Sequence, residues 1–165
     1  MPVAPELVEL LEHARTVARR TSGALDVTVE PLMRLWGFRG RHGGARPSDR
    51  ALHLALDAVG IDGLSIERAE VGLLKPGAAL DLGGVAVGYA LDRAAAIARR
   101  EGVTAALIEM SGDFYAIGAP PESERGWEIG VQDPSRRDAL CATLHISDAG
   151  LSTSGNYANT VVYHA

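Results

Sequence analysis

A double glycine follows an aspartate within the stretch Ala79–Ala94 (ALDLGGVAVGYALDRA), and this combination could bind a phosphorylated ligand. Gly83 and Gly84 have no Cβ atoms, so a ligand can come close to their backbone. We expect a helix to begin at about Val85, and the first N–H groups of a helix have no partner within it. Such N–H groups and the positive end of the helix dipole favour an anion, most often phosphate.

Neither standard phosphate motif is present in this stretch. The dinucleotide fingerprint G-x-G-x-x-G does not match the spacing of Gly83, Gly84 and Gly88. The P-loop requires Lys and then Ser or Thr where this chain has Tyr89 and Ala90. The alternative interpretation is a tight strand-to-helix turn with close helix packing. Taken alone, the stretch leaves the phosphate site and the packing turn both open.

Amphipathic patterns predict the elements that must position these residues. Apolar residues at helical spacing predict a helix from Pro5 to Arg20. Strict alternation from Leu25 to Glu30 predicts a half-buried strand, which the following proline ends. The next apolar segment is expected to form a short helical turn or a loop, with Trp36 and Phe38 as core anchors beneath it.

Capping residues and turn signals delimit the later elements. Ser48 suits the N-cap of a helix from Asp49 to Val59, and residues 64–76 predict two short strands. A strand from Ala79 to Leu82 should lead through the double glycine into a helix from Val85 to Glu101. Further strands are predicted at Val103–Glu109, Phe114–Gly118, Trp127–Gln132, Leu140–Ile146, Gly150–Ser154 and Thr160–Tyr163.

This order of elements predicts an α+β fold with a mixed, mostly antiparallel sheet and packed helices. The chain has 165 residues and suits a single domain over residues 1–165. The net charge of −5 argues against a nucleic-acid partner, and no apolar run is long enough for a membrane span. The single cysteine, Cys141, excludes an internal disulfide and a cysteine-based metal cluster.

Four segments occur in the order and at the separations of one known family. They are Ser22–Phe38 (SGALDVTVEPL through LWGF), Asp81–Arg93 (DLGGVAVGYALDR), Glu109–Gly118 (EMSGD with AIG) and Ser152–Tyr157 (STSGNY). Together they resemble the ApbE family, the FAD:protein FMN transferases. The resemblance covers the central portion of the family domain, so we expect an ApbE-like fold that is incomplete at both ends.

The resemblance implies a phosphoryl transfer that depends on a divalent metal, usually Mg²⁺. In the reaction that the resemblance implies, a threonine hydroxyl of a target flavoprotein, a subunit of a redox complex, attacks FAD. FMN becomes esterified to the threonine and AMP leaves. Two alternatives stay open. The chain could be an FAD pyrophosphatase that yields FMN and AMP, or a non-catalytic flavin-binding module. The family also implies a place in the bacterial cell envelope, as a membrane-tethered lipoprotein on the periplasmic side.

Residues that match the family's FAD contacts lie in two segments. Ala24, Leu25 and Asp26 match one contact segment, and the predicted strand leaves Asp26 on its polar face, where it could accept hydrogen bonds from adenine or ribose. Asp81 matches a further FAD contact. Because a carboxylate repels a pyrophosphate, we expect Asp81 to hold a donor group of the ligand or to act through the metal. The alternative for Asp26 is a solvated aspartate.

The two remaining residues that match family positions are one metal ligand and one residue of the predicted helix. Gly84 matches the position whose backbone carbonyl binds the metal, and a carbonyl oxygen suits a hard cation such as Mg²⁺. Val87 matches an FAD-contacting position where many relatives have Lys, which would supply a positive charge near the phosphates. No Ser/His/Asp arrangement is evident, so no catalytic side chain is assigned. With one metal ligand in view, we expect these residues alone to bind FAD weakly and turn it over poorly.

Overall fold

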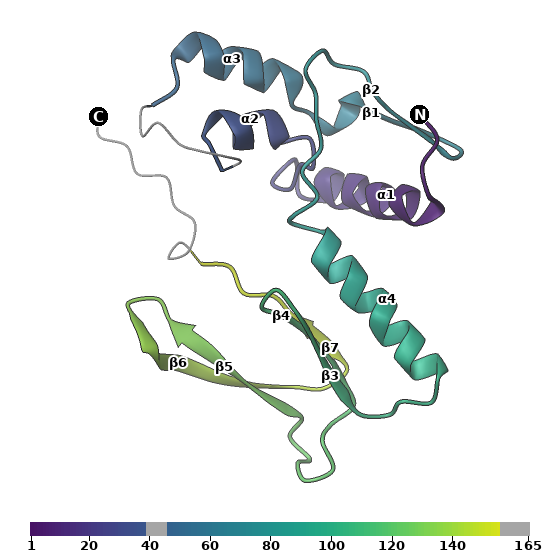
Figure 1. The fold of residues 1–165 in the computed structure, drawn as a ribbon, viewed down its shortest axis with the longest axis vertical. Coiled ribbons are helices and arrows are strands. Elements are labelled where there is room, and N and C mark those ends of the chain that lie inside the picture. The colour runs from purple at the N-terminus through teal and green to yellow at the C-terminus, as the bar shows by residue number, and fades with distance from the viewer. Residues whose placement is uncertain (39–45, 156–165) are drawn as a thin grey trace. The chain divides into compact units, whose positions relative to one another are not determined.

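The computed structural model describes residues 1–38 and 46–155 and divides into two compact units. The first unit runs to Val85 and the second begins at Ala86 (Figure 1). The first unit combines helices with a two-stranded sheet, and the described part of the second combines one helix with two small antiparallel sheets, so the predicted α+β class is confirmed. In place of one larger sheet, the described residues form three separate sheets of two or three strands. The strand predicted at Thr160–Tyr163 lies outside the described residues.

Helix α1, Pro5–Arg20, provides the core of the first unit and has the predicted bounds. Its proline lies in the first turn, where an amide would have no acceptor within the helix. Glu6 in the first turn and Arg20 in the last complement the helix dipole. The apolar side of the helix is buried, and the core cluster of this unit contains Leu11, Ala14, Val27 and Leu64.

The strand predicted from Leu25 to Glu30 is wrong. Residues 24–28 form bends and turns, and Val29 makes a single parallel bridge to Ala79. Glu30 begins the short helix α2, Glu30–Leu35, with its proline in the first turn. A proline ring fixes φ near the helical value and lacks an amide hydrogen, so it suits a helix start as well as a strand end.

Helix α3, Asp49–Ala58, packs against α2 in the first unit. The hydroxyl of Ser48 accepts a hydrogen bond from the amide of Ala51 at 3.3 Å, which confirms the predicted N-cap. After α3 the chain makes a single 3₁₀ turn, η1, at Ile61–Gly63. This turn brings the chain back beside the residues that precede α2, through hydrogen bonds described below.

A short hairpin completes the first unit. Strand β1, Leu64–Glu67, pairs antiparallel with β2, Glu70–Leu73, as the sequence predicted. Arg68 has a positive φ of 56° in the connecting turn. The strand predicted at Ala79–Leu82 is reduced to the one bridge at Ala79, and the rest of this segment has no regular secondary structure before the double glycine.

The second unit packs one helix on a three-stranded sheet. Helix α4, Ala86–Arg100, agrees with the predicted helix to within one residue at each end. Strands β3 (Ala106–Met110), β4 (Asp113–Ile117) and β7 (Ala149–Leu151) form an antiparallel sheet in the order β3–β4–β7. Contacts join α4 to β3 and β4, and Leu91 and Ala95 of α4 are buried (Figure 1).

A two-stranded ribbon forms the rest of the second unit. Strand β5, Trp127–Asp133, pairs antiparallel with β6, Arg136–Ile146. The register shifts between Val131 and Gln132, where the ladder contains a bulge. Cys141 lies at this irregularity as an exposed free thiol, and its Sγ is 3.5 Å from the carbonyl oxygen of Val131.

Arg99 and Asp148 join α4 to the turn between β6 and β7. Arg99 Nη2 donates to Asp148 Oδ1 at 2.6 Å, and Nη1 donates to the hydroxyl of Tyr115 at 3.2 Å. The amide of Gly118 donates to the same Asp148 oxygen at 3.1 Å. The Gly118 amide, followed by the Arg99 guanidinium, lowers the pKa of the Asp148 carboxyl below its ordinary value.

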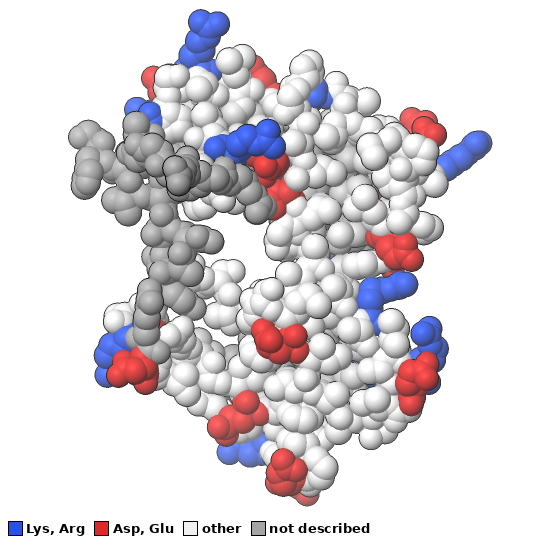
Figure 2. Space-filling model, in the orientation of Figure 1, with Lys and Arg blue, Asp and Glu red and all other residues white. Residues whose placement is uncertain are grey.

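The surface carries charges of both signs. Figure 2 shows Lys and Arg side chains interspersed with Asp and Glu on the visible face. Within residues 1–38 and 46–155, none of the helices has both the length and the apolar character needed to cross a bilayer.

Candidate functional site

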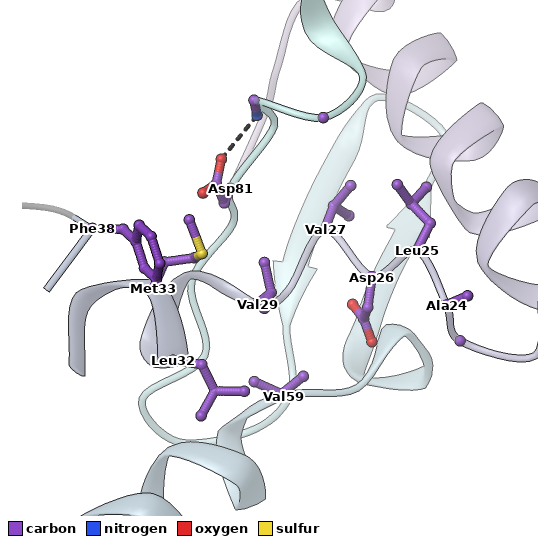
Figure 3. Close-up of a pocket in the computed structure, with 13 residues that line it drawn as sticks. Ala24, Leu25, Asp26, Val27, Val29, Leu32, Met33, Phe38, Val59 and Asp81 are labelled. Atoms are coloured by element: carbon purple, nitrogen blue, oxygen red, sulfur yellow. Dashed lines mark hydrogen bonds between the residues drawn. The ribbon is translucent and has the colours of Figure 1, made fainter. Parts of the chain in front are cut away.

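A cavity of about 670 Å³ lies in the first unit (Figure 3). Its volume falls in the range of small-molecule and cofactor sites, about 300–1,000 Å³. Four stretches of chain form its wall: the bends before α2, the α2 region itself, Val59 at the end of α3, and the double-glycine turn. The lining residues are Gly23, Ala24, Leu25, Asp26, Val27, Val29, Leu32, Met33, Phe38, Val59, Asp81, Gly83 and Gly84.

Five of the six residues that the resemblance assigns to FAD or metal line this one cavity: Ala24, Leu25, Asp26, Asp81 and Gly84. They come from two segments more than fifty positions apart in the sequence. The backbone joins these segments directly, because the amide of Asp81 donates to the carbonyl oxygen of Val27 at 2.8 Å. The sixth residue, Val87, is half-buried on α4 in the second unit and is not part of the lining.

Asp26 is held in a hydrogen-bond network on one wall of the cavity. Its Oδ1 accepts from the amide of Thr28 at 2.8 Å and from the Thr28 hydroxyl at 2.6 Å, while Oδ2 accepts from the amide of Ile61 at 3.0 Å. The Thr28 hydroxyl in turn accepts from the amide of Gly60 at 2.7 Å. Both carboxylate oxygens of Asp26 therefore have donors within the protein, and any ligand contact would use their remaining lone pairs.

The double-glycine turn is stabilised by the aspartate before it. Asp81 Oδ1 accepts from the amide of Gly83 at 2.8 Å, as the dashed line in Figure 3 marks, and the amide of Val85 donates to the carbonyl oxygen of Leu82 at 3.0 Å. The amides of Gly83 and Val85 thus bond within the turn. An Asp that bonds the backbone two residues later is a common turn device, so this part of the stretch agrees with the packing interpretation.

Gly84 leaves the edge of the cavity open. A Cβ atom placed on it would lie 3.8 Å from Leu25 Cδ1, which is an ordinary contact, and Gly84 is exposed. The surrounding protein therefore does not require glycine here, whereas a ligand that approaches the backbone would. The phosphate interpretation predicts this open edge at the second glycine of the turn, because a ligand would need it to reach the backbone.

The described residues do not make up a complete magnesium site. A hard divalent cation takes about six oxygen ligands. Gly84 could offer one carbonyl oxygen. Throughout residues 1–38 and 46–155, no group of three or more His, Cys, Asp or Glu side chains is placed to hold a metal ion. The described part of the chain therefore offers one ligand of such a site and not the full set.

Met33 and Phe38 form an apolar wall that the sequence analysis missed. Phe38 was predicted as a core anchor, but its side chain is 43% exposed and lines the cavity. The end of α2 explains its position. Gly37 has a φ of 75°, its amide donates to the carbonyl oxygen of Arg34, and the Phe38 amide donates to that of Met33 at 2.8 Å.

This helix ending joins the backbone of Phe38, after the glycine, to that of Met33, before it. The two bonds form a Schellman motif, in which the residue after the glycine commonly packs on the residue that accepts its amide. Met33 and Phe38 both line the cavity, and Figure 3 draws their side chains at its wall. A glycine two residues after the last helical position was the available signal, and it could have placed Phe38 at this wall.

Comparisons with known proteins agree on one family. A model of the ApbE family matches residues 1–165. The chain is 31% identical over 164 residues to the FAD:protein FMN transferase of Klebsiella pneumoniae, and 32% identical over 171 residues to that of Salmonella typhimurium. Each match covers 96% of this chain and 47% of the relative.

Solved structures give the same likeness. A crystal structure of the ApbE protein from Thermotoga maritima matches with a TM-score of 0.84 at 34% identity, over 95% of this chain and 51% of that one. The flavin transferase ApbE from Vibrio cholerae also matches with a TM-score of 0.84, at 27% identity, over 99% of this chain and 53% of that one. The chain spans about half the length of the curated relatives and solved chains it matches.

Proposed function

We propose that this chain, which belongs to the ApbE family, supplies the flavin-dinucleotide pocket of an FAD:protein FMN transferase. One observation carries the proposal: Ala24, Leu25, Asp26, Asp81 and Gly84 line a single cavity of about 670 Å³. The resemblance assigns these residues to FAD and its metal on sequence grounds alone, and they come from separated segments. Relatives named FAD:protein FMN transferase support the same reaction. We also propose that residues 1–165 form part of one functional domain.

The proposed reaction moves FMN from FAD to a threonine of a second protein. The threonine oxygen forms a bond to the FMN-side phosphorus, and the phosphoanhydride P–O bond breaks. AMP leaves with the electrons of that bond, and the hydroxyl proton passes to water. Such a displacement requires little covalent chemistry from the protein, so its main task is to hold the pyrophosphate in line with the attacking hydroxyl.

The pocket offers surfaces for both parts of a dinucleotide, the flat rings and the polar group that links them. Leu32, Met33, Phe38 and Val59 offer an apolar wall on which one of the flat rings of FAD can lie. The exposed backbone of the double-glycine turn offers the opposite character, a close approach for a polar linking group. The hydrogen bonds of Asp26 and Asp81 fix both segments before ligand arrives, so little ordering is required on binding.

The metal and the second protein complete the proposal. The resemblance implies Mg²⁺, which would supply charge neutralisation at the pyrophosphate, and we propose the Gly84 carbonyl as its ligand in this chain. The acceptor is a threonine-bearing flavoprotein, as in a redox-complex subunit, and the proposed place of action is the bacterial cell envelope. A second candidate is a flavin-binding module without catalysis. It is favoured because the described residues include no group of three or more His, Cys, Asp or Glu side chains that could hold the metal.

One incubation separates these possibilities. The native protein is mixed with FAD, Mg²⁺ and a threonine-bearing acceptor, and the products are analysed by mass spectrometry and nucleotide chromatography. The proposal predicts an acceptor heavier by one esterified FMN, with an equal amount of AMP. Free FMN and AMP without modified acceptor would identify a pyrophosphatase. Binding of FAD without either product would identify the non-catalytic module.

A further inference from the structure

Lys75 is the only lysine in the sequence, and its side chain is held at an unusual place. It follows β2 and is half-buried. Its ammonium group donates a hydrogen bond to the backbone carbonyl oxygen of Val59, at the end of α3. Lysines normally extend their charged ends into water. Here the charge stabilises one backbone carbonyl, sixteen positions away in the sequence.

Two glycines make room for the Lys75 side chain. A Cβ atom on Gly63 would lie 3.2 Å from Lys75 Cγ and 3.3 Å from Cδ, and one on Gly60 would lie 2.8 Å from Nζ. Gly60 also has a φ of 136°, which by itself favours glycine. Gly63 has no such positive φ, so at this position the Lys75 stem is the feature that a larger side chain would crowd.

The carbonyl that Lys75 holds belongs to the wall of the cavity. Val59 lines the cavity, and the next two amides bind the opposite segment: Gly60 donates to the Thr28 hydroxyl and Ile61 donates to the Asp26 carboxylate. Residues 59–61 are therefore held from both sides. Lys75 acts on one side and the Asp26 network on the other, although Lys75 is not part of the lining.

We propose that Lys75 is a positioning residue for the flavin-dinucleotide pocket, acting through the Val59 carbonyl and the glycine pair Gly60 and Gly63. This inference rests on the proposed function of the pocket. Lys75 touches no ligand in this account. It fixes residues 59–61, and these fix the Asp26 wall against which the ligand binds.

The test uses Lys75→Met and Gly63→Ala in the native protein. Lys75→Met keeps an unbranched stem that reaches as far as Cε and removes the donor, while Gly63→Ala displaces the lysine stem from its observed position. We expect each to raise the KM for FAD and its dissociation constant about three- to tenfold with kcat unchanged. Arg50→Met, which removes an exposed cation of α3 away from the cavity, should leave both constants as in the wild type.

A double variant sharpens the result. When Lys75→Ala vacates the seat, adding Gly63→Ala should cause no further loss of FAD affinity, because the two changes act on one contact. The proposal is overturned if Lys75→Met lowers the thermal midpoint but leaves FAD affinity within twofold of wild type, or if the Lys75→Ala and Gly63→Ala effects multiply. Failure of the wild-type protein to bind FAD would overturn the proposed function as well. Wild-type binding that is insensitive to Lys75 would overturn only the role of Lys75, so the two failures can be told apart.

Discussion

The carboxylate of Asp26 accepts two hydrogen bonds from Thr28, one from its amide at 2.8 Å and one from its hydroxyl at 2.6 Å. The same hydroxyl accepts from the amide of Gly60, and the Thr28 side chain is only 1% exposed. One buried hydroxyl thus joins the wall of the cavity to the segment after α3. The arrangement orients Asp26 without any ligand present.

Thr28→Val should destabilise the protein, because it preserves the shape of the side chain and removes this hydroxyl. The Gly60 amide would lose its acceptor inside the protein, at a cost of about 1–3 kcal/mol in the free energy of unfolding. Urea unfolding of the variant measures this cost. Thr28→Ser keeps the hydroxyl and should retain most of the hydrogen-bond contribution. Equal losses in the two variants would contradict the role given to the hydroxyl.

Phe38→Ala should weaken FAD binding by about tenfold, equivalent to about 1.4 kcal/mol, because a flat ring would lose its aromatic neighbour. Its effect on folding should be small, since the Phe38 side chain is 43% exposed. Fluorescence titration of FAD and a thermal unfolding curve give the two values. Phe38→Tyr keeps the ring and serves as the control. A large drop in the thermal midpoint with unchanged affinity would return Phe38 to the role of core anchor.

We propose that Val87→Lys tightens FAD binding, because the resemblance implies a positively charged lysine near the phosphates at this position of α4. The gain should shrink as salt is raised, since added ions screen charge interactions. Val87→Met adds length without charge and should show no such salt dependence. FAD titrations at low and high salt distinguish the two variants, and a gain that is independent of salt would argue against a charge effect.

The free energy of unfolding of the second unit should fall at low pH, because the Asp148 carboxylate becomes protonated. Its pKa is lowered in the folded chain, chiefly by the Gly118 amide and then by Arg99. The stabilisation is therefore present above the ordinary carboxyl pKa and is lost as the pH falls through the folded value. Asp148→Asn should show a flatter loss of unfolding free energy than wild type between about pH 5 and pH 2. Parallel profiles would show that Asp148 contributes nothing.

Asp133 serves as an internal control for the pH experiment on Asp148. Its pKa is lowered too, first by the hydroxyl and then by the amide of Ser135, and it is unchanged in Asp148→Asn. The variant should therefore keep the part of the acid sensitivity that Asp133 causes. Adding Asp133→Asn to Asp148→Asn should flatten the profile further, because Asp133 at the end of β5 and Asp148 before β7 have different hydrogen-bond partners.

Elements with strong local patterns could be predicted from the sequence. The helix Pro5–Arg20 has its predicted bounds, because its apolar stripe, early acids and late arginines all favour the same structure. The hairpin of β1 and β2 was also predicted. The strand at Leu25–Glu30 was wrong for a local reason. Asp26 and Thr28 alternate with apolar residues, yet they bond each other across a turn rather than face solvent from a strand.

The candidate site could be predicted only in part. Ala24, Asp81 and Gly84, which line the cavity, were predicted as site residues because their motifs resemble a known family. The bonds from Gly60 and Ile61 to the Asp26 network join positions more than thirty residues apart, and no local pattern announces such a contact. The amides of Gly83 and Val85 also bond within their turn, which a pattern of glycines before a helix cannot show.

The central claim is that this cavity binds FAD, and filling it tests that claim most directly. Ala24 is an exposed lining residue, so Ala24→Trp should block the cavity while the core stays intact. Ala96→Trp places the same ring on the exposed face of α4, outside the lining, and serves as the control. Calorimetric titration with FAD should show wild-type affinity for Ala96→Trp and at least about tenfold weaker binding for Ala24→Trp at an unchanged thermal midpoint. Equal FAD affinity in the wild type and Ala24→Trp would contradict the account.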